Sequence, residues 1–486
     1  MASALAGKRA ALILLTGVEL IVFLDVSIIN LAMPTIGAAL GMSVVALVWV
    51  STAYQVTFGG FQLGAGRATD LLGPRRMFQV GLAVFTAASL LAGLAQWGWL
   101  LIAARAVQGL GAAILIPAEL ALITSTFTEP EAYRRAFGVW SAMGAVGAAG
   151  GVALGGIIVQ TLGWEWVFLL NLPIGVAGLV LSGRLLPADG VDLSAVGRRR
   201  LDLPGMVTGT GALLLLVYVV TAAAEGGMGP VQWLLTVLGV LLGAAFLLIE
   251  RKVDEPLLPF RIFRERNISG SAAANLVVGA THVPAFVFIS LYFQEVHGYS
   301  AIRAGMAVLP IALVSIPVSR TLIPVALKAA GPRLVLAFGM TAMAVALFLM
   351  GRLPVDADYL TGFLPAALIF AVGLPACFVG ATMPGVKAAA PGQTGIVSGV
   401  VNTTQRLGAG LGVALLASLA QSRTASVGGD RAAALNAGFH YAFLGAAAMA
   451  VVGVVVALTV IRPEPPKVEP VELADLAARP SGAAAE

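Results

Sequence analysis

Long apolar runs constrain this chain more than any other feature. Runs of about 20 apolar residues recur along its 486 residues, and a helix of that length crosses the hydrocarbon core of a bilayer. Hydrophobic residues make up 59% of the chain and charged residues 11%, whereas a soluble domain has about 45–50% and 25%. The sequence predicts an all-α polytopic membrane protein with fourteen spans, at 11–33, 45–64, 77–97, 99–123, 135–157, 166–186, 204–223, 233–250, 269–293, 302–325, 333–351, 360–382, 396–419 and 437–461.

The distribution of basic residues predicts the orientation. An even number of spans places both termini on one side, and the loops of that side hold nearly all the Lys and Arg residues. The opposite loops hold only Arg303, Arg352, Arg423 and Arg431. By the positive-inside rule, both termini are cytoplasmic. Because the chain is rich in Ala, Gly and Val and poor in Lys, as is typical of a high-GC bacterium, we expect a multi-pass protein of a bacterial plasma (inner) membrane.

A short internal repeat predicts two related halves. Gly73-Pro74-Arg75 with Gly81 recurs as Gly331-Pro332-Arg333 with Gly339, each time where a cytoplasmic loop leads into a predicted helix. Repeated halves with a site between them are a transporter design. We therefore divide the chain into a six-helix half (1–200), two inserted helices (201–252), a second six-helix half (253–462) and a disordered cytoplasmic tail (463–486).

Several classes of protein are disfavoured by what the sequence lacks. The single cysteine, Cys377, cannot form an intrachain disulfide, and the three histidines have no metal-ligand spacing. No phosphate-binding P-loop occurs, so we do not expect ATP to drive transport. The net charge of +5 comes from short loops and does not indicate nucleic-acid binding. We expect no cofactor, no metal and no nucleic acid, and we take a monomer as the simplest assumption.

The turn between the second and third predicted helices carries the most informative motif. It reads Gly66-Arg67-Ala68-Thr69-Asp70-Leu71-Leu72-Gly73-Pro74-Arg75-Arg76, and such a charged turn has to lie at the water boundary. Asp70 is suited to cap a helix N-terminus or to pair with an arginine of a facing helix. The motif resembles the loop between helices 2 and 3 of the major facilitator superfamily, although an ordinary basic loop is the alternative. The resemblance implies a cytoplasmic gating loop formed by Gly66, Asp70, Gly73, Arg75 and Arg76.

Further segments resemble one branch of that superfamily, the fourteen-span drug–proton antiporters of the EmrB/QacA type. They are the segments 24–34 (LDVSIINLAMP), 105–111 (RAVQGLG) and 163–175 (GWEWVFLLNLPIG). Two positions depart from the pattern, since Val152 replaces a proline and Glu165 an arginine. The antiporter motif of the fifth predicted helix comprises Gly138, Gly147, Gly151, Gly155 and Gly156.

Ionisable residues inside predicted spans indicate a site. A charged side chain at the bilayer centre costs about 2.5–3.5 kcal/mol on insertion scales, so it needs a partner or a wet cavity. The resemblance implies that the first and fourth helices are neighbours that line the central cavity. From this and from their depths we expect Asp25 to pair with Arg105 in the outer half, and Glu19 to meet Glu119 in the inner half. Two adjacent carboxyl groups keep one proton near neutral pH, which suits proton coupling, although a static hydrogen bond is the alternative for Glu19. The candidate cavity residues are Asp25, Arg105, Glu119, Glu19, Asn30, Gln108, Arg406 and Asn402.

The resemblance implies a secondary active exporter that works by alternating access and proton antiport. The implied substrates are lipophilic drugs or antibiotics, and three acidic against two basic residues within the membrane favour a cationic group. A proton-coupled symporter and an exporter of an anionic or neutral metabolite are alternatives. A membrane-embedded lipid-linked transferase is a remote one, because the external loops are too short for a catalytic site. We therefore expect a transporter rather than an enzyme.

Overall fold

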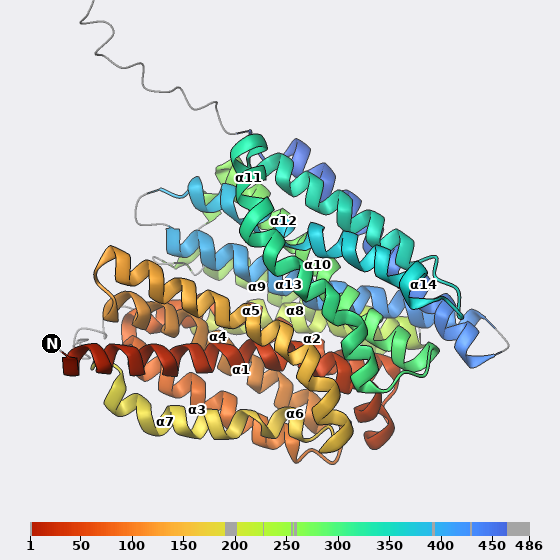
Figure 1. The fold of residues 1–486 in the computed structure, drawn as a ribbon, viewed down its shortest axis with the longest axis horizontal. Helices are drawn as coiled ribbons and strands as arrows, with labels where there is room; N and C mark the ends of the chain where they lie inside the picture. The colour runs from red at the N-terminus through yellow and green to blue at the C-terminus, as the bar shows by residue number, and fades with distance from the viewer. Residues whose placement is uncertain are drawn as a thin grey trace, which may run out of the picture.

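The regular elements of this computed structural model are helices in all the described parts of the chain, which are residues 2–189, 202–226, 228–253, 256, 260–390, 394–427 and 430–463. Long helices run roughly side by side (Figure 1). Short helical turns occur at Phe260–Arg264, Tyr292–Val296 and Tyr359–Phe363. The α-helices are α1 (Ala2–Leu40), α2 (Val44–Leu72), α3 (Pro74–Gly93), α4 (Gly98–Thr126), α5 (Pro130–Thr161), α6 (Trp166–Leu169), α7 (Asn171–Leu185), α8 (Leu203–Gly226), α9 (Pro230–Lys252), α10 (Arg266–Leu291), α11 (Ala301–Met350), α12 (Leu364–Lys387), α13 (Thr394–Ser426) and α14 (Arg431–Thr459).

The predicted apolar runs lie on these helices. The sixth run is divided between α6 and α7, and the tenth and eleventh runs both lie in α11. Gly331 breaks α11 with a φ of 73°, and the following Pro332 lacks the N–H that would continue the hydrogen bonding. Nine helical segments of the described residues, with α11 counted once, are long and apolar enough to cross a membrane. The count of fourteen crossings stays a prediction.

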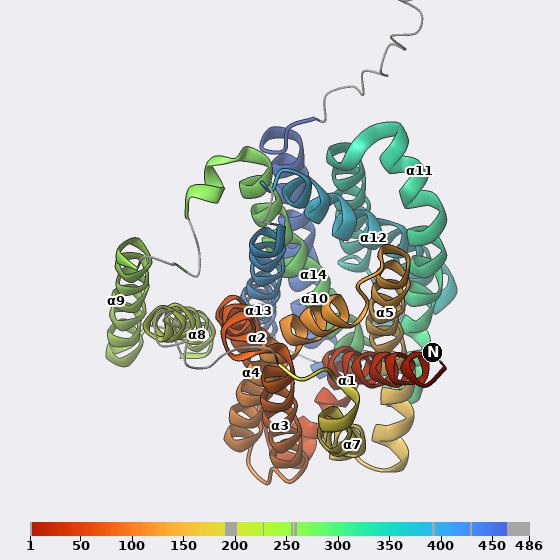
Figure 2. The same cartoon turned by 90° about the vertical axis from the view of Figure 1, so that its left-hand side faces the viewer.

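The helices form two groups joined near their middle. In the first group α1 packs on α5, and α4 packs on α2 and α3; in the second group α10 packs on α13, and α11 on α12 and α14. Figure 2 shows the first group below and the second above. The groups meet where α2 contacts α13 and α5 contacts α11. These two contacts determine how side chains of one group reach the other.

The α8–α9 hairpin lies outside both groups. α8 packs on α2 and on α13, so it covers the place where these helices meet, and α9 packs on α8 at the edge of the molecule (Figure 2). Glycines of α2 allow the close approach, because a Cβ at Gly60 would collide with Thr210 and one at Gly64 with Met206. Val56, Val217 and Ala414 form a buried apolar cluster between the three helices α2, α8 and α13.

Glycines of α5 determine how this helix packs. Gly147 and Gly151 face α1, where an added Cβ would lie 2.5 and 2.7 Å from backbone oxygens. Gly155 also faces α1, whereas Gly156 faces the start of α11 in the second group. Small residues at this spacing let helix backbones approach closely. Gly138 differs from the others, because no atom lies within 4 Å of the Cβ it lacks.

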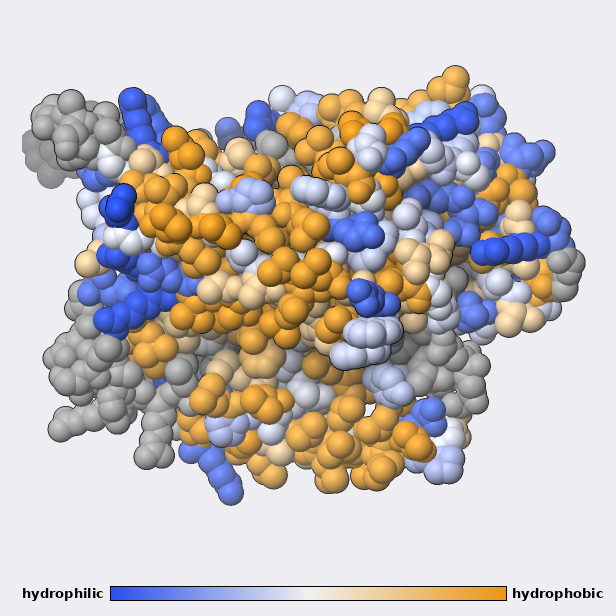
Figure 3. All heavy atoms as spheres, turned by 90° about the horizontal axis from the view of Figure 1, so that it is seen from below, coloured by the Kyte–Doolittle hydropathy of each residue, from blue (hydrophilic) through white to orange (hydrophobic). Residues whose placement is uncertain are grey.

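The outer surface matches a lipid environment. Apolar side chains cover most of the middle of the face in Figure 3, and hydrophilic side chains gather towards its two ends. On α3 and α7, Val80, Leu91, Val176 and Val180 are 49–67% exposed. Such an apolar surface between polar ends is stable in a bilayer, where helices satisfy their own backbone hydrogen bonds.

Candidate functional site

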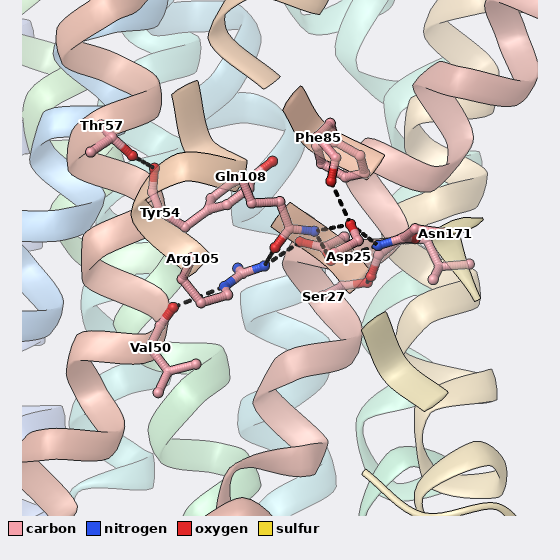
Figure 4. Close-up of polar contacts among 11 residues, drawn as sticks. Asp25, Ser27, Val50, Tyr54, Thr57, Phe85, Arg105, Gln108 and Asn171 are labelled. Atoms are coloured by element: carbon pink, nitrogen blue, oxygen red, sulfur yellow. Dashed lines mark hydrogen bonds and ion pairs between the residues drawn. The ribbon is translucent and has the colours of Figure 1, made fainter. Parts of the chain in front are cut away.

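Asp25 of α1 is at the centre of a buried polar network (Figure 4). Its Oδ2 accepts a hydrogen bond from Arg105 Nη1 at 2.5 Å. Its Oδ1 accepts from Gln108 Nε2 at 2.8 Å and from Asn171 Nδ2 at 3.0 Å. None of these four side chains is more than 1% exposed. The contact between Asp25 and Arg105 that the sequence predicts is therefore present, and it joins α1, α4 and the start of α7.

Arg105 is held on all sides. Its Nη1 also donates to Gln108 Oε1 at 2.7 Å, and its Nε donates to the backbone oxygen of Val50 at 3.0 Å. Its Cζ lies 4.3 Å from the ring centroid of Tyr54, a cation–π distance. A buried ion pair is stable only when such additional contacts satisfy its remaining polar atoms. The network therefore has the character of a rigid joint between helices.

The sequence of α4 explains why this joint forms. Arg105 and Gln108 are three residues apart and so share one helix face. Gly109 lets α4 approach α2, because a Cβ there would collide with Tyr54 and Thr57. Gly111 does the same towards α3, where a Cβ would lie 2.7 Å from the backbone nitrogen of Phe85. On each of these faces of α4 a polar residue therefore lies one turn from a glycine: Arg105 and Gly109 both meet Tyr54 of α2, and Gln108 and Gly111 both face α3.

Glu19 and Glu119 form a second buried cluster. Their side chains are 1% and 0% exposed, and a hydrogen bond joins the two carboxyl groups. Trp140 of α5 donates its Nε1–H to Glu119 Oε2 at 2.8 Å. Ionised carboxylates have only acceptors, so a hydrogen bond between two of them requires one proton on the pair. This buried acid pair can therefore hold one shared proton.

Arg406 of α13 brings a positive charge from the second group. Its Cζ lies 4.5 Å from the ring centroid of Phe58 and 5.5 Å from that of Phe23. Its Nη1 lies 3.5 Å from Gln55 Oε1, and its charge attracts the carboxyl group of Glu19. Arg406 is half-buried, whereas Asn402, one helical turn earlier, is exposed.

Asn30 lies at another contact between the groups. Its backbone oxygen accepts a hydrogen bond from Ser290 Oγ of α10 at 2.7 Å. Its side-chain oxygen is buried and has no hydrogen-bond partner among the described residues. Asn30 thus differs from Gln108, the other amide candidate, whose side chain belongs to the network around Asp25.

The charged turn between α2 and α3 is held by a residue that sequence reasoning missed. Asp189, which follows α7, caps α3: its Oδ1 accepts from the backbone N–H of Arg75 at 2.8 Å, and its Oδ2 from that of Arg76 at 3.0 Å. Gly73 permits this contact, because its φ is 95° and a Cβ there would collide with Asp189. Arg75 also donates to the backbone oxygen of Gly183 at 2.5 Å. The side chain that caps α3 is therefore that of Asp189, and the cap or ion pair expected of Asp70 stays a prediction.

The remaining residues of that turn have looser surroundings. Asp70 is exposed, yet partial burial raises the pKa of its carboxyl above the usual range, against the opposing effect of the Arg67 guanidinium. A Cβ at Gly66 would lie 3.8 Å from Pro117, an ordinary contact distance. Gly66 is therefore not required for close packing in this conformation.

The comparison with known proteins identifies the family. Residues 15–413 match the family model of the Major Facilitator Superfamily. The chain belongs to this superfamily. Among its relatives are the puromycin resistance protein of Streptomyces alboniger, 39% identical over 85% of this chain and 82% of that protein, and a cephamycin export protein of Amycolatopsis lactamdurans, 36% identical over 85% of each. The tetracenomycin C resistance and export protein of Streptomyces glaucescens is 31% identical over 90% of this chain and 80% of that protein.

Solved structures of facilitator transporters share the fold. A nucleoside transporter superposes with a TM-score of 0.66 at 10% identity, covering 94% of this chain and all of that one. A bacterial homologue of the human lysosomal transporter Spinster superposes with a TM-score of 0.65 at 15% identity, covering 93% of this chain and 96% of that one. This membrane protein therefore has the major facilitator fold, and it is a transporter rather than an enzyme.

Three residues of this facilitator's polar clusters have no role in the sequence-based prediction. Asn171 lies in the segment 163–175, which the sequence alone identifies as a motif. Its hydrogen bond to Asp25 could not be predicted from that motif. Tyr54 and Trp140 are aromatic residues within apolar runs, where a packing role is the usual one. Their polar atoms become informative only once the structure places them beside Arg105 and Glu119.

Proposed function

We propose that this transporter exports lipophilic small molecules, antibiotics among them, in exchange for protons. The named activities of the relatives, resistance to puromycin and export of cephamycin and tetracenomycin C, support drug efflux. The acid pair of Glu19 and Glu119 supports proton coupling and is the observation that carries the proposal.

We propose that transport occurs by alternating access, in which two halves of the molecule move relative to each other around the site. We assign α1–α7 and α10–α14 to the halves and α8–α9 to an insertion, with both termini in the cytoplasm. Two contacts between the halves, the Ser290–Asn30 hydrogen bond and Gly156 against Ala301, lie towards the ends of the helices remote from the N-terminus. We therefore assign this conformation to the state that opens to the cytoplasm. Alternating access then requires that those contacts separate.

The chemistry of exchange follows from the acid pair. Antiport requires proton and substrate to exclude one another, so that binding of one weakens binding of the other. A cationic group that arrives beside Glu19 and Glu119 favours the fully ionised pair and so expels the shared proton. Asp25 takes a different part in this scheme, because its contacts with Arg105 hold α1 against α4 and thereby keep Glu19 facing Glu119.

A second candidate is the export of an anionic substrate. Arg406 favours it, because this residue is half-buried and its guanidinium lies over the faces of two phenyl rings. An anion placed there would, however, reduce the attraction of Arg406 for Glu19 and so favour protonation of the acid pair. Substrate and proton would then bind together, which opposes antiport.

Efflux of ethidium, a lipophilic cation, from proteoliposomes with an imposed proton gradient tests the proposal. We expect gradient-driven efflux that a protonophore abolishes, and loss of that efflux in Glu19→Gln and in Glu119→Gln. Glu131→Gln removes an equal charge at an exposed site of α5 and is expected to leave efflux unchanged. Efflux that ignores the protonophore, or that persists in both acid-pair variants, would refute the proton assignment. Transport of an anionic dye but not of ethidium would favour the second candidate.

A further inference from the structure

Arg406 reaches from one half of the transporter to the other at a close approach of α2 and α13. A Cβ added to Gly59 of α2 would lie 2.9 Å from Arg406 Cβ and 3.3 Å from the backbone nitrogen of Leu407. The absence of a side chain on Gly59 therefore lets α13 approach α2 closely at this position. The guanidinium then extends over Phe58 of α2 and Phe23 of α1, both in the opposite half.

The aromatic residues of α2 connect Arg406 with the network around Asp25. Tyr54 and Phe58 are one helical turn apart and meet edge to face, with 5.8 Å between ring centroids. Arg105 lies over Tyr54 at 4.3 Å, and Arg406 lies over Phe58 at 4.5 Å. The two rings therefore carry an arginine from each half. Arg105 is fixed by its ion pair, whereas among the described residues Arg406 has, besides the rings, a 3.5 Å contact to Gln55.

The charges that face the acid pair come from a few elements. Arg406 of α13 is the cation that attracts Glu19, and Tyr54 of α2 is uncharged at neutral pH. Asp25 of α1 and Arg105 of α4 balance each other, and α5 contributes the neutral indole of Trp140. His282 of α10, within the electrostatic reach of Arg406, has its Nδ1 2.7 Å from the backbone oxygen of Val278. Arg406 is thus the charge of the second half most directly affected by the charge of the acid pair.

We propose that Arg406 is a positioning residue that prevents the empty transporter from changing conformation. The inference rests on the proposed function. With one shared proton the acid pair has a charge of −1, and without it −2. The more negative pair attracts Arg406 more strongly and holds α13 on α2. A proton or a cationic substrate restores −1 and releases this contact, so the halves rock when either is bound and stay docked when neither is.

This arrangement supplies what exchange requires. An antiporter that reoriented while empty would let its substrate flow downhill without a counter-ion. The attraction of Arg406 to the bare acid pair opposes that step, while the flat packing of its guanidinium on Phe58 sets where α13 docks. Lysine at this position would keep the charge but not the planar packing.

The test compares exchange with net efflux of ethidium in proteoliposomes at equal pH on both sides. Ethidium–ethidium exchange needs no empty reorientation, whereas net efflux needs the return of a protonated carrier. In the unaltered protein, net efflux should fall by up to about tenfold for each pH unit of alkalinisation, because the protonated population falls by that factor once the pair is mostly ionised. In Arg406→Gln, exchange should persist, and net efflux should become nearly independent of pH.

Three further variants keep the test decisive. Arg423→Gln removes an equal charge at the far end of α13 and should behave as the unaltered protein does. Arg406→Lys should restore part of the pH dependence. If Arg406→Gln does not fold, Phe58→Leu is the alternative, because it keeps the charge and removes the ring beneath it. Net efflux by Phe58→Leu should depend less on pH than net efflux by the unaltered protein.

The failures of the two proposals are distinguishable. Unchanged pH dependence of net efflux in Arg406→Gln, or in Phe58→Leu where the first variant does not fold, would overturn the role of Arg406 and leave proton antiport intact. Loss of exchange in a folded Arg406→Gln would also overturn it, since Arg406 would then belong to the substrate path. Net efflux of the unaltered protein that ignores pH and protonophore would instead refute the proposed function.

Discussion

Replacement of Asp25 by asparagine tests whether the buried network is a joint between helices. Asparagine has nearly the same shape, so its oxygen can still accept from Gln108 and Asn171. Its amide nitrogen would then take the place of Oδ2, 2.5 Å from Arg105 Nη1, and set a donor against a donor. Arg105, 1% exposed, would be left as an unbalanced charge.

The expected magnitude follows from that loss. Breaking a buried ion pair by removal of one partner costs about 3–5 kcal/mol, and each 1.4 kcal/mol is tenfold in the folding equilibrium. We therefore expect Asp25→Asn to shift that equilibrium by about two to almost four powers of ten. Arg105→Gln should cost a similar amount, because it leaves the carboxylate unbalanced. The double variant removes both charges and should be less destabilised than the sum of the single changes.

Unfolding of the purified transporter by SDS in mixed micelles measures these free energies. A double-mutant cycle gives the coupling between Asp25 and Arg105, which we expect to exceed about 2 kcal/mol. The same cycle at Glu295 and Arg431, a pair 3.4 Å apart with 30% and 84% exposure, is the matched control and should give at most about 1 kcal/mol. Additive effects at Asp25 and Arg105, within about 0.5 kcal/mol, would refute the idea of a buried joint.

Two further predictions concern packing and pH. Gly151→Ala should destabilise the protein by about 1–3 kcal/mol, since its Cβ would lie 2.7 Å from the backbone oxygen of Leu24. Gly138→Ala, in open space, should stabilise it by up to about 1 kcal/mol. Unfolding of both variants by SDS measures these free energies. Burial and the nearby Arg303 lower the pKa of His297, in a loop outside the predicted spans, below its ordinary value of 6.5. The folded state disfavours the cation, so His297 contributes stability that is present above pH 6.5 and lost as the pH falls through the lowered pKa. His297→Gln should flatten the acid side of the stability profile, and an unchanged profile would contradict the assignment.

The sequence predicted the elements better than their partners. The length of the apolar runs located the helices, and the glycine–proline pair at 331–332 lies between two runs that form the bent helix α11. The contact between Asp25 and Arg105 could be predicted from their similar depths together with the family resemblance, which implies that the first and fourth helices are neighbours.

The sequence did not predict the side chain that caps α3 or the hydrogen bond of Trp140 to Glu119. Asp189 caps α3 from 114 residues away, and it stands in a polar segment that offers several equivalent acceptors. Asp70 lies much nearer to α3 along the chain, but its side chain is exposed. Trp140 reaches Glu119 only because α5 packs beside α4, a relation that spacing along the chain does not encode.

The position of α8 makes the two sides of the molecule unequal. One line of contact between the halves, α2 with α13, is covered by α8, whose Thr210 and Met206 fit against glycines of α2. The other line, α5 with α11, has no such cover from the α8–α9 hairpin (Figure 2). A molecule dissolved in the bilayer would have to displace α8 to pass between the halves on the first side. A lipophilic molecule would therefore enter the interior from the bilayer more easily between α5 and α11 than between α2 and α13.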